Sequence, residues 1–364
     1  MPFAVAIAVA LGLVLSAPYV GQVRGIIRRE FPGHFVLVVG LIVAAGLCAA
    51  LLAAVLRIRD RRPRRYGALA AALLIAGAYA TYRAGDNPES NVVELLHFLQ
   101  YGLITFLFYR AWRPLGDLAS ILLPALAGLI VGTVEEWFQW FIPGRVGVMD
   151  DIFLNLVAIG CGLLFSTAVD PPAAHVTRLH PGSRARLASM AAAALLAFAA
   201  FFHIVHLGHR VQDDEAGLFM SRYSRDHLLE LQSDTAVRWK LAPPSVQLVR
   251  LSRENQYLTE GIQHVRWRNE LWDAGEIRGA WLENRILEKY YEPVLDTPTH
   301  EGAGHRWPAE QRADAESRAA SIVIREPYVS DAYPYDLYPW PKVLFWVVAA
   351  LAVAGIRSLG RVRR

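Results

Sequence analysis

Residues 34–56 read HFVLVVGLIVAAGLCAALLAAVL and contain no aspartate, glutamate, lysine or arginine. An apolar stretch of about 20 residues is long enough for an α-helix to cross a hydrocarbon core about 30 Å thick. Other stretches of the chain share this character, although two of them are shorter. The predicted spans are 2–20, 34–56, 66–82, 95–112, 118–140, 151–169, 188–207 and 340–356. We therefore predict an all-α fold, a polytopic membrane helix bundle of about eight spans.

The composition agrees with a membrane protein. Apolar residues make up 54% of the 364 positions and charged residues only 19%, whereas soluble domains carry about 25% charged residues. The net charge of +4 does not mark a nucleic-acid-binding protein, because the arginines lie in short clusters at the ends of apolar stretches. Cys48 and Cys161 both lie inside such stretches, which excludes a disulfide framework and indicates small core residues.

The arginine clusters predict the orientation of the chain, since positive side chains accumulate in cytoplasmic loops. Clusters follow the second, fourth, sixth and eighth predicted spans, so both termini are expected in the cytoplasm. The arginines at 24, 28 and 29 disagree, and we interpret 21–32 as an interfacial amphipathic helix. Alanine and arginine richness is typical of a GC-rich bacterial genome, which suggests a multi-pass protein of the bacterial inner membrane. The supporting clusters are Arg57, Arg59, Arg61, Arg62, Arg64 and Arg65; Arg110 and Arg113; Arg178, Arg184 and Arg186; and Arg357, Arg361, Arg363 and Arg364.

The polar residues divide the chain further. Residues 208–338 are expected to form an extracytoplasmic, mainly helical domain, with one helical pattern around Leu228 and another from Trp267 to Ile286. Pro243-Pro244 and 293–308 interrupt it, and Ser321–Ile324 favours a strand. The predicted parts are 1–65 with two N-terminal helices, 66–169 with four helices, 170–207 with a cytoplasmic loop and the seventh helix, 208–338 as the exterior domain, and 339–364 with the last helix and a basic tail.

Polar residues gather at one end of three predicted spans. They recur three or four positions apart, so within each span they share a helix face. In the predicted topology all of them lie at the outer end of their span. Charged groups in a membrane are retained when they are paired or functional. The residues are His97 and Tyr101, Glu136 and Gln139, and Asp151 and Asn155.

Two interpretations of these residues remain open. A carboxylate, an imidazole and a guanidinium within reach of one another can carry out acid–base chemistry, and Arg145 could hold a phosphate by a forked contact. Alternatively, the polar side chains only hydrogen-bond the helices together. Glu135 and Asp150 are expected to face water as the weaker members of their acidic pairs.

The same region resembles a known family. The pattern His97-x-x-x-Tyr101, Glu136-x-x-Gln139, Pro143-x-Arg145, Asp151-x-x-x-Asn155 and Gly162 is similar to that of the VanZ-like bacterial membrane proteins. The resemblance covers about 66–169. Val93-Glu94 stands where the family often has Asp-Lys, and Ala158 stands where it often has glycine. The namesake of the family is associated with resistance to the glycopeptide teicoplanin. The resemblance implies a four-helix unit that processes lipid head groups or lipid-linked cell-wall precursors.

The resemblance implies roles for these residues. His97 would be the base, and Glu136 or Asp151 the acid or the group that orients the histidine. Arg145 would bind the anionic group, while Tyr101, Gln139 and Asn155 position the substrate. A divalent ion held by Asp151 and Glu136 is an alternative, and the sequence does not identify a cofactor.

The expected function is therefore hydrolysis or transfer of a lipid head group or lipid-linked precursor at the outer leaflet, linked to glycopeptide tolerance. The runner-up is a non-catalytic scaffold or sensor whose exterior domain binds an envelope protein. A transporter is a third reading, since Pro124 could break the fifth span, but no charged residue accompanies it.

Three histidines recur at the exit of the seventh predicted span. His203, His206 and His209 are three apart, so they are expected to line one helix face. They could bind a metal, although an interfacial histidine face is the simpler reading. The chain shows no phosphate-binding loop, nucleophile elbow or zinc-protease motif.

Overall fold

The computed structural model describes residues 2–142, 147–172, 179–242, 253–298, 302–320, 327–333 and 335–361. The chain divides into two compact units. The first, here called the membrane unit, comprises Met1–Gln139, Gly147–Phe201 and Trp346–Arg364. The second, here called the polar unit, comprises Trp140–Val146 and Phe202–Phe345.

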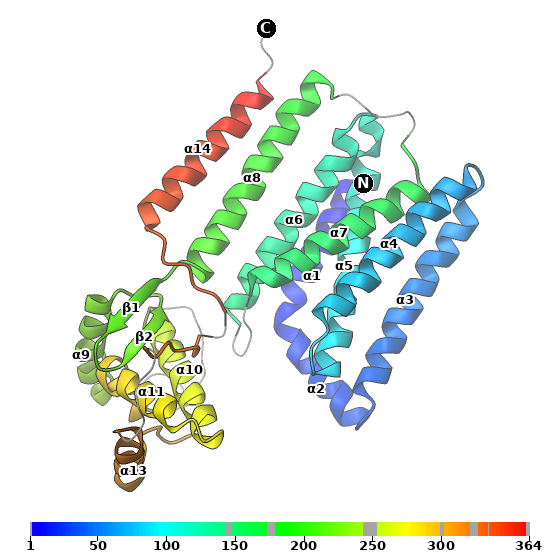
Figure 1. The fold of residues 1–364 in the computed structure, drawn as a ribbon. Helices are drawn as coiled ribbons and strands as arrows, with labels where there is room; N and C mark the ends of the chain where they lie inside the picture. Colours follow the sequence, from blue (N-terminus) through cyan, green and yellow to red (C-terminus); the bar gives the residue numbers. More distant parts are fainter. Residues whose placement is uncertain are drawn as a thin grey trace. The chain divides into compact units, whose positions relative to one another are not determined.

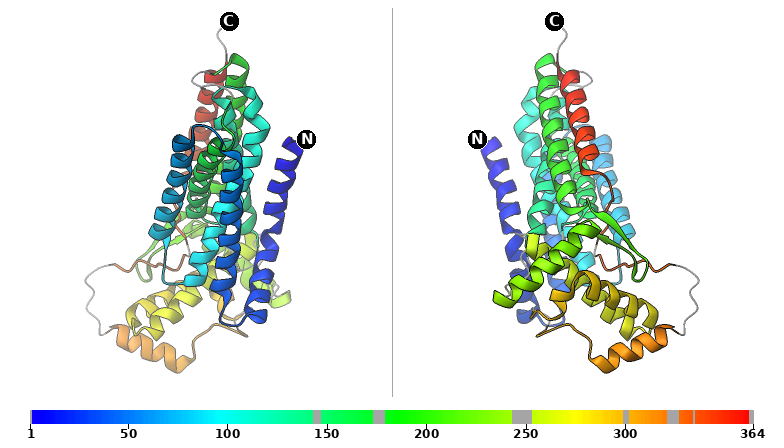
Figure 2. Two further views of the ribbon diagram at one scale, coloured as in Figure 1. Left: turned by 90° about the vertical axis from the view of Figure 1, so that its right-hand side faces the viewer. Right: turned by 90° about the vertical axis from the view of Figure 1, so that its left-hand side faces the viewer.

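The membrane unit consists of long helices that run side by side (Figures 1 and 2). Apolar side chains cover them on most sides, as expected for helices surrounded by lipid. In chain order, the helices of this unit, short ones included, are α1 (Pro2–Ser16), η1 (Ala17–Tyr19), α2 (Val20–Glu30), α3 (Phe35–Arg57), α4 (Arg62–Arg83), α5 (Pro88–Trp112), η2 (Arg113–Leu115), α6 (Ala119–Trp140), α7 (Met149–Val169), α8 (Pro181–Val205) and α14 (Lys342–Gly360).

Among the described residues, seven helices are long and apolar enough to cross a membrane. The protein is therefore a multi-pass, all-α membrane helix bundle. α4 is a helix at the place of the third predicted span, but it is not one of the seven, because arginines occupy both of its ends. The seven are Pro2–Glu30, Phe35–Arg57, Pro88–Leu115, Ala119–Trp140, Met149–Val169, Pro181–Val205 and Lys342–Gly360.

α7 packs closely against α5 and α4. Gly162 makes the contact with α5 possible, because a Cβ at this position would lie 2.9 Å from the Cα of Gly102 and 3.0 Å from the Cβ of Thr105. Small residues at such crossings let helix backbones approach in membranes. On the other side, the thiol of Cys161 donates to the carbonyl of Ala72 on α4 at 3.4 Å, so this cysteine is a core residue.

The carboxyl end of α7 is capped by an arginine from α4. Arg65 donates to the carbonyl of Ala168 at 2.5 Å and to the carbonyl of Val169 at 2.9 Å. The last carbonyls of a helix have no partner within the helix, and a positive charge also complements the negative end of the helix dipole. Arg65 thus holds α4 and α7 together, besides its predicted place in an orienting cluster.

The polar unit begins with an antiparallel hairpin that the sequence did not predict. β1 (His209–Asp213) pairs with β2 (Gly217–Ser221), with His209 opposite Ser221. The helices that follow are α9 (Arg225–Leu241), α10 (Arg253–Asp273), α11 (Ile277–Tyr290), α12 (Glu292–Leu295) and α13 (Ala309–Ala320). The strand predicted at Ser321–Ile324 and the break at Pro243-Pro244 lie outside the described residues.

The predicted helical pattern from Trp267 to Ile286 is two helices. α10 ends at Asp273 and α11 starts at Ile277, with Gly275 between them at a φ of 81°. A positive φ is accessible to glycine at little cost, so Gly275 allows the chain to turn back. Apolar residues of both helices, among them Ile262 and Ile286, then meet in one core.

A buried polar stripe runs along α10. It comprises residues four positions apart, namely Gln256, Glu260, His264 and Arg268. Glu260 accepts from the hydroxyl of Ser221 at 2.6 Å and from that of Tyr291 at 3.0 Å. His264 Nδ1 lies 2.7 Å from Glu283 Oε2. Buried polar groups need such partners, so the stripe fixes one arrangement of the hairpin and helices.

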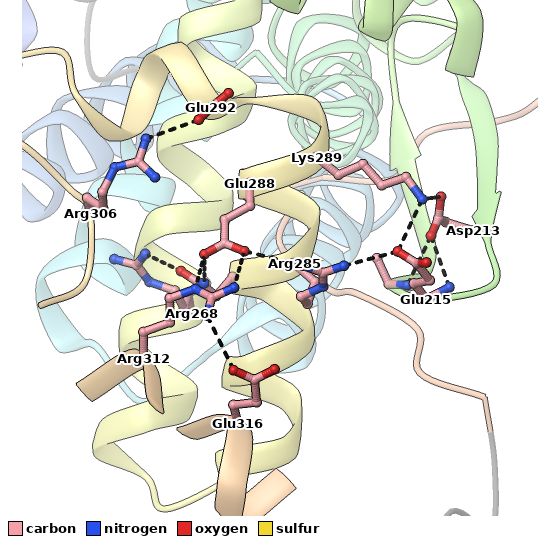
Figure 3. A network of polar contacts seen from close by, with 12 residues as sticks. Asp213, Glu215, Arg268, Arg285, Glu288, Lys289, Glu292, Arg306, Arg312 and Glu316 are labelled. Carbon is pink, nitrogen blue, oxygen red and sulfur yellow. Dashed lines mark hydrogen bonds and ion pairs between the residues drawn. The ribbon is translucent and has the colours of Figure 1, made fainter. Parts of the chain in front are cut away.

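Ion pairs connect the outer surface of α11 to its neighbours (Figure 3). Lys289 Nζ lies 2.8 Å from Asp213 of the hairpin, and Arg312 of α13 lies 2.7 Å from Glu288. Burial raises the pKa of Asp213, but hydrogen bonds from Lys289 and Tyr290 outweigh it, so the pKa lies well below its ordinary value. Asp213 therefore stabilises the hairpin as a carboxylate.

Candidate functional site

The predicted polar residues of α5 and α7 meet. Nδ1 of His97 lies 2.8 Å from Oδ1 of Asn155, which is fully buried. An amide oxygen accepts, so Nδ1 carries the hydrogen and Nε2 of the neutral ring carries the lone pair. Asn155 therefore orients the His97 ring so that the basic nitrogen of that ring, Nε2, points away from the Asn155 side chain.

A second contact joins α5 to α6. The hydroxyl of the fully buried Tyr101 donates to Oε2 of Glu135. The ring of Tyr101 also lies nearly parallel to that of His97, with centroids 6.2 Å apart. We expected Glu135 to face water, and this is wrong. The Glu135 side chain instead points into the helix bundle. There Tyr101 and Gln139 donate the hydrogen bonds that a buried carboxylate needs.

Gln139 connects both glutamates of α6. Its Nε2 donates to Glu135 Oε1 at 3.2 Å and to Glu136 Oε1 at 3.0 Å. All three side chains are buried. Glu136 and Gln139 therefore lie on the same face of α6, as predicted, and the Glu135 side chain contacts Gln139 as well.

Two glycines make room for this arrangement. A Cβ at Gly132 of α6 would lie 3.1 Å from Nδ2 of Asn155 and 3.3 Å from Cε1 of Tyr101. A Cβ at Gly147 would lie 1.9 Å from the carbonyl oxygen of Glu136. Any larger residue at Gly147 would displace the chain that enters α7.

Arg83 is a member of the site that the sequence analysis missed. It ends α4, and its guanidinium lies 3.2 Å from Asp151, 3.1 Å from Asp150 and 3.4 Å from Glu94. A signal was present, because Arg83 is an arginine at the end of a predicted span opposite the basic clusters. Asp150 is exposed, as expected, with 68% of its side chain accessible.

A cleft of about 550 Å³ lies beside Arg83. Residues of α4, α5 and α7 line it, and charged groups occupy one part of the lining while apolar groups occupy the rest. The lining residues are Tyr79, Tyr82, Arg83, Glu94, Asp150, Phe153, Leu156 and Val157. Leu156 of this lining follows Asn155, the partner of His97, along α7.

Arg145, the predicted anion-binding residue, lies outside the described residues. Within the described part of the chain, no group of three histidine, cysteine or acidic residues could hold a metal ion. Asp151 contacts Arg83, and Glu136 contacts Gln139.

The histidines near α8 do not share a helix face, contrary to expectation. α8 ends at Val205 and His209 begins β1, so the helical spacing does not continue through them. His206 instead places Nδ1 2.8 Å from the carbonyl oxygen of Asp336.

The site thus combines an oriented imidazole, buried carboxylates, an arginine and a neighbouring cleft, contributed by α4, α5, α6 and α7. Such a combination can move protons and bind a charged group. No protein-family model matches the chain, and neither curated proteins nor solved structures show a significant match to it.

Proposed function

We propose that this protein is a VanZ-like enzyme of the bacterial cell envelope that hydrolyses or transfers a lipid head group or lipid-linked precursor at the outer leaflet. One observation carries the proposal: polar side chains from α5, α6 and α7 converge at one end of the helices, with His97 held by Asn155. Chance placement would scatter such groups over depths and faces.

In this mechanism Nε2 of His97 removes a proton from water or from an acceptor hydroxyl. The resulting oxygen attacks the phosphorus, and the bond to the leaving oxygen breaks. Glu136 in its protonated form, or Asp151 once it has exchanged its ion pair with Arg83 for a proton, gives a proton to that oxygen. Gln139 and Asn155 position the substrate, since Nδ2 of Asn155 has no hydrogen-bond partner among the described residues. Tyr101 aligns the site through Glu135, and Arg145 holds the anionic group.

The topology belongs to the same proposal. We place α4 across the membrane as an eighth span, because it packs along α7 and contacts both ends of it through Arg65 and Arg83. Eight spans put both termini in the cytoplasm, the polar unit outside, and the His97 site at the outer face of the inner membrane.

A non-catalytic scaffold or sensor is the alternative, with an envelope protein bound to the polar unit. The interhelical hydrogen bonds favour it, because His97–Asn155 and Tyr101–Glu135 would hold the helices even without turnover. Complementation of a deletion strain by His97→Gln and Asp151→Asn, read as lipid profile and glycopeptide tolerance, decides between the two.

A further inference from the structure

The cleft beside Arg83 changes character along α7. Arg83, Glu94 and Asp150 form its charged end, while Phe153, Leu156 and Val157 line it farther along the helix. Asp150 and Val157 are separated by about 10 Å along the axis, at 1.5 Å per residue. An elongated ligand with a charged head and an apolar body matches this order.

The apolar part of the cleft is accessible from the side of the bundle. Phe153 is 50% exposed and Leu156 is 44% exposed, and both lie on a membrane-spanning helix. Large apolar side chains exposed on such a helix contact lipid tails. A lipid can therefore reach the charged end without leaving the bilayer.

The charges at the head of the cleft select the kind of lipid. One guanidinium, Arg83, is surrounded by three carboxylates, so negative charge is in excess. Arg83 lines the cleft, and its guanidinium can donate to a phosphate oxygen. The surplus carboxylates can pair with a positive group next to that phosphate. Asp150 is the most accessible of them.

We propose that this cleft binds a zwitterionic phospholipid with a primary amine, of the phosphatidylethanolamine class. Its phosphate contacts Arg83, its ammonium contacts Asp150 and Glu94, and an acyl chain lies along Phe153 and Leu156. An ammonium donates three hydrogen bonds, whereas a trimethylammonium group donates none. This lipid class makes the substrate of the proposed function more specific. Binding of the lipid does not depend on that function, whereas its chemical conversion rests on it.

Binding can be measured without turnover. The full-length protein is purified and given phosphatidylethanolamine, phosphatidylcholine or phosphatidylglycerol with identical acyl chains, and retained lipid is quantified by native mass spectrometry. Phosphatidylethanolamine should be retained about threefold or more over each of the others. Asp150→Asn should remove that preference, while Asp86→Asn, an exposed carboxylate outside the cleft lining, should keep it.

A second pair of variants tests the apolar part of the cleft. Leu156→Trp fills the cleft and should lower retention of all three lipids, whereas Leu74→Trp on exposed α4 surface outside the lining should not. Equal retention of the three lipids by the wild-type protein, or a preference that survives Asp150→Asn, would overturn the inference.

The lipid-binding test and the complementation test of the proposed enzyme can succeed or fail independently. His97 does not line the cleft, so His97→Gln should retain phosphatidylethanolamine as the wild type does. Loss of complementation by His97→Gln without any lipid preference in the wild type overturns the lipid class and keeps the enzyme. A clear preference together with full complementation by His97→Gln keeps the binding site and overturns the enzyme.

Discussion

Nδ1 of His97 and Oδ1 of Asn155 lie 2.8 Å apart and join α5 to α7. The contact has different consequences in the two readings of the site. For an enzyme, it fixes which nitrogen of His97 accepts a proton. For a scaffold, it is one interhelical hydrogen bond, worth about 0.6 kcal/mol on average in membranes.

His97→Gln and Asp151→Asn separate these readings. Glutamine and asparagine keep much of the shape and hydrogen bonding but cannot exchange a proton at neutral pH. We expect both variants to lose function in the complementation assay while membrane abundance and detergent melting stay normal. His34→Gln, at an exposed histidine outside the site, is the control and should complement. Full complementation by both site variants would leave the scaffold as the better reading.

The Tyr101–Glu135 contact should be energetically coupled. Tyr101→Phe removes the donor and leaves a buried carboxylate oxygen with one partner fewer, so we expect a loss of about 1–3 kcal/mol. In a double-mutant cycle with Glu135→Gln, the coupling should reach about 0.5–1.5 kcal/mol. The measurement is reversible unfolding in mixed micelles. Strictly additive effects would show that the two side chains do not interact.

Gly162 and Gly160 form a matched pair on α7. An added Cβ at Gly162 meets the backbone of Gly102 at 2.9 Å, whereas at Gly160 it meets nothing within 4 Å. Gly162→Ala should therefore separate α5 from α7 and destabilise the protein by about 1–3 kcal/mol. Gly160→Ala should be neutral or slightly stabilising, because alanine favours helix more than glycine does. Equal melting temperatures for the two variants would contradict the packing described here.

Asp213 makes the stability of the polar unit depend on pH. Its pKa is lowered in the folded state, so its contribution is complete above the unfolded value of about 4 and is lost as the pH falls toward the folded pKa. Asp213→Asn should lower the melting temperature at pH 7 and flatten its decline below about pH 4. The control is Asp214→Asn, at the exposed neighbour. An unchanged acid decline in Asp213→Asn would remove Asp213 as its cause.

The span count depends on α4. Single cysteines replace Asp60 before this helix and Asp86 after it, in a protein whose Cys48 and Cys161 are changed to alanine. If α4 crosses the membrane with cytoplasmic termini, an impermeant thiol reagent labels position 86 in intact cells but not position 60. Labelling of both or of neither would return α4 to the membrane surface and place the termini on opposite sides.

Much of the membrane unit could be predicted from the sequence, because hydropathy alone decides which segments form long apolar helices. The spacing of His97, Glu136 and Asp151 also predicted polar groups at one end of neighbouring helices. The spacing could not decide how each helix is rotated about its own axis, and therefore which side chains point into the bundle. Glu135 and Glu136 are adjacent, and the packing of α6 brings both inward.

Other features depend on contacts between distant residues. Arg83 contacts Asp151 across 68 positions, which no local pattern records. The β1–β2 hairpin includes charged Arg210 and Asp213 and so lacks a clear apolar alternation. The helical period across Gly275 continued in the sequence although the chain turns there. In each case tertiary partners, rather than local preference, determine the structure.

α4 is held to α7 by an arginine at each end, Arg65 at the carbonyls of Ala168 and Val169, and Arg83 at Asp151. The ribosome completes α4 long before it makes α7. The arginines at the two ends of this helix therefore lack these partners during synthesis until the later segment is made. Assembly of this part of the protein is then a late event, finished only once α7 has left the ribosome, and shortened chains that stop before α7 should expose α4 to the proteases that remove unassembled membrane proteins.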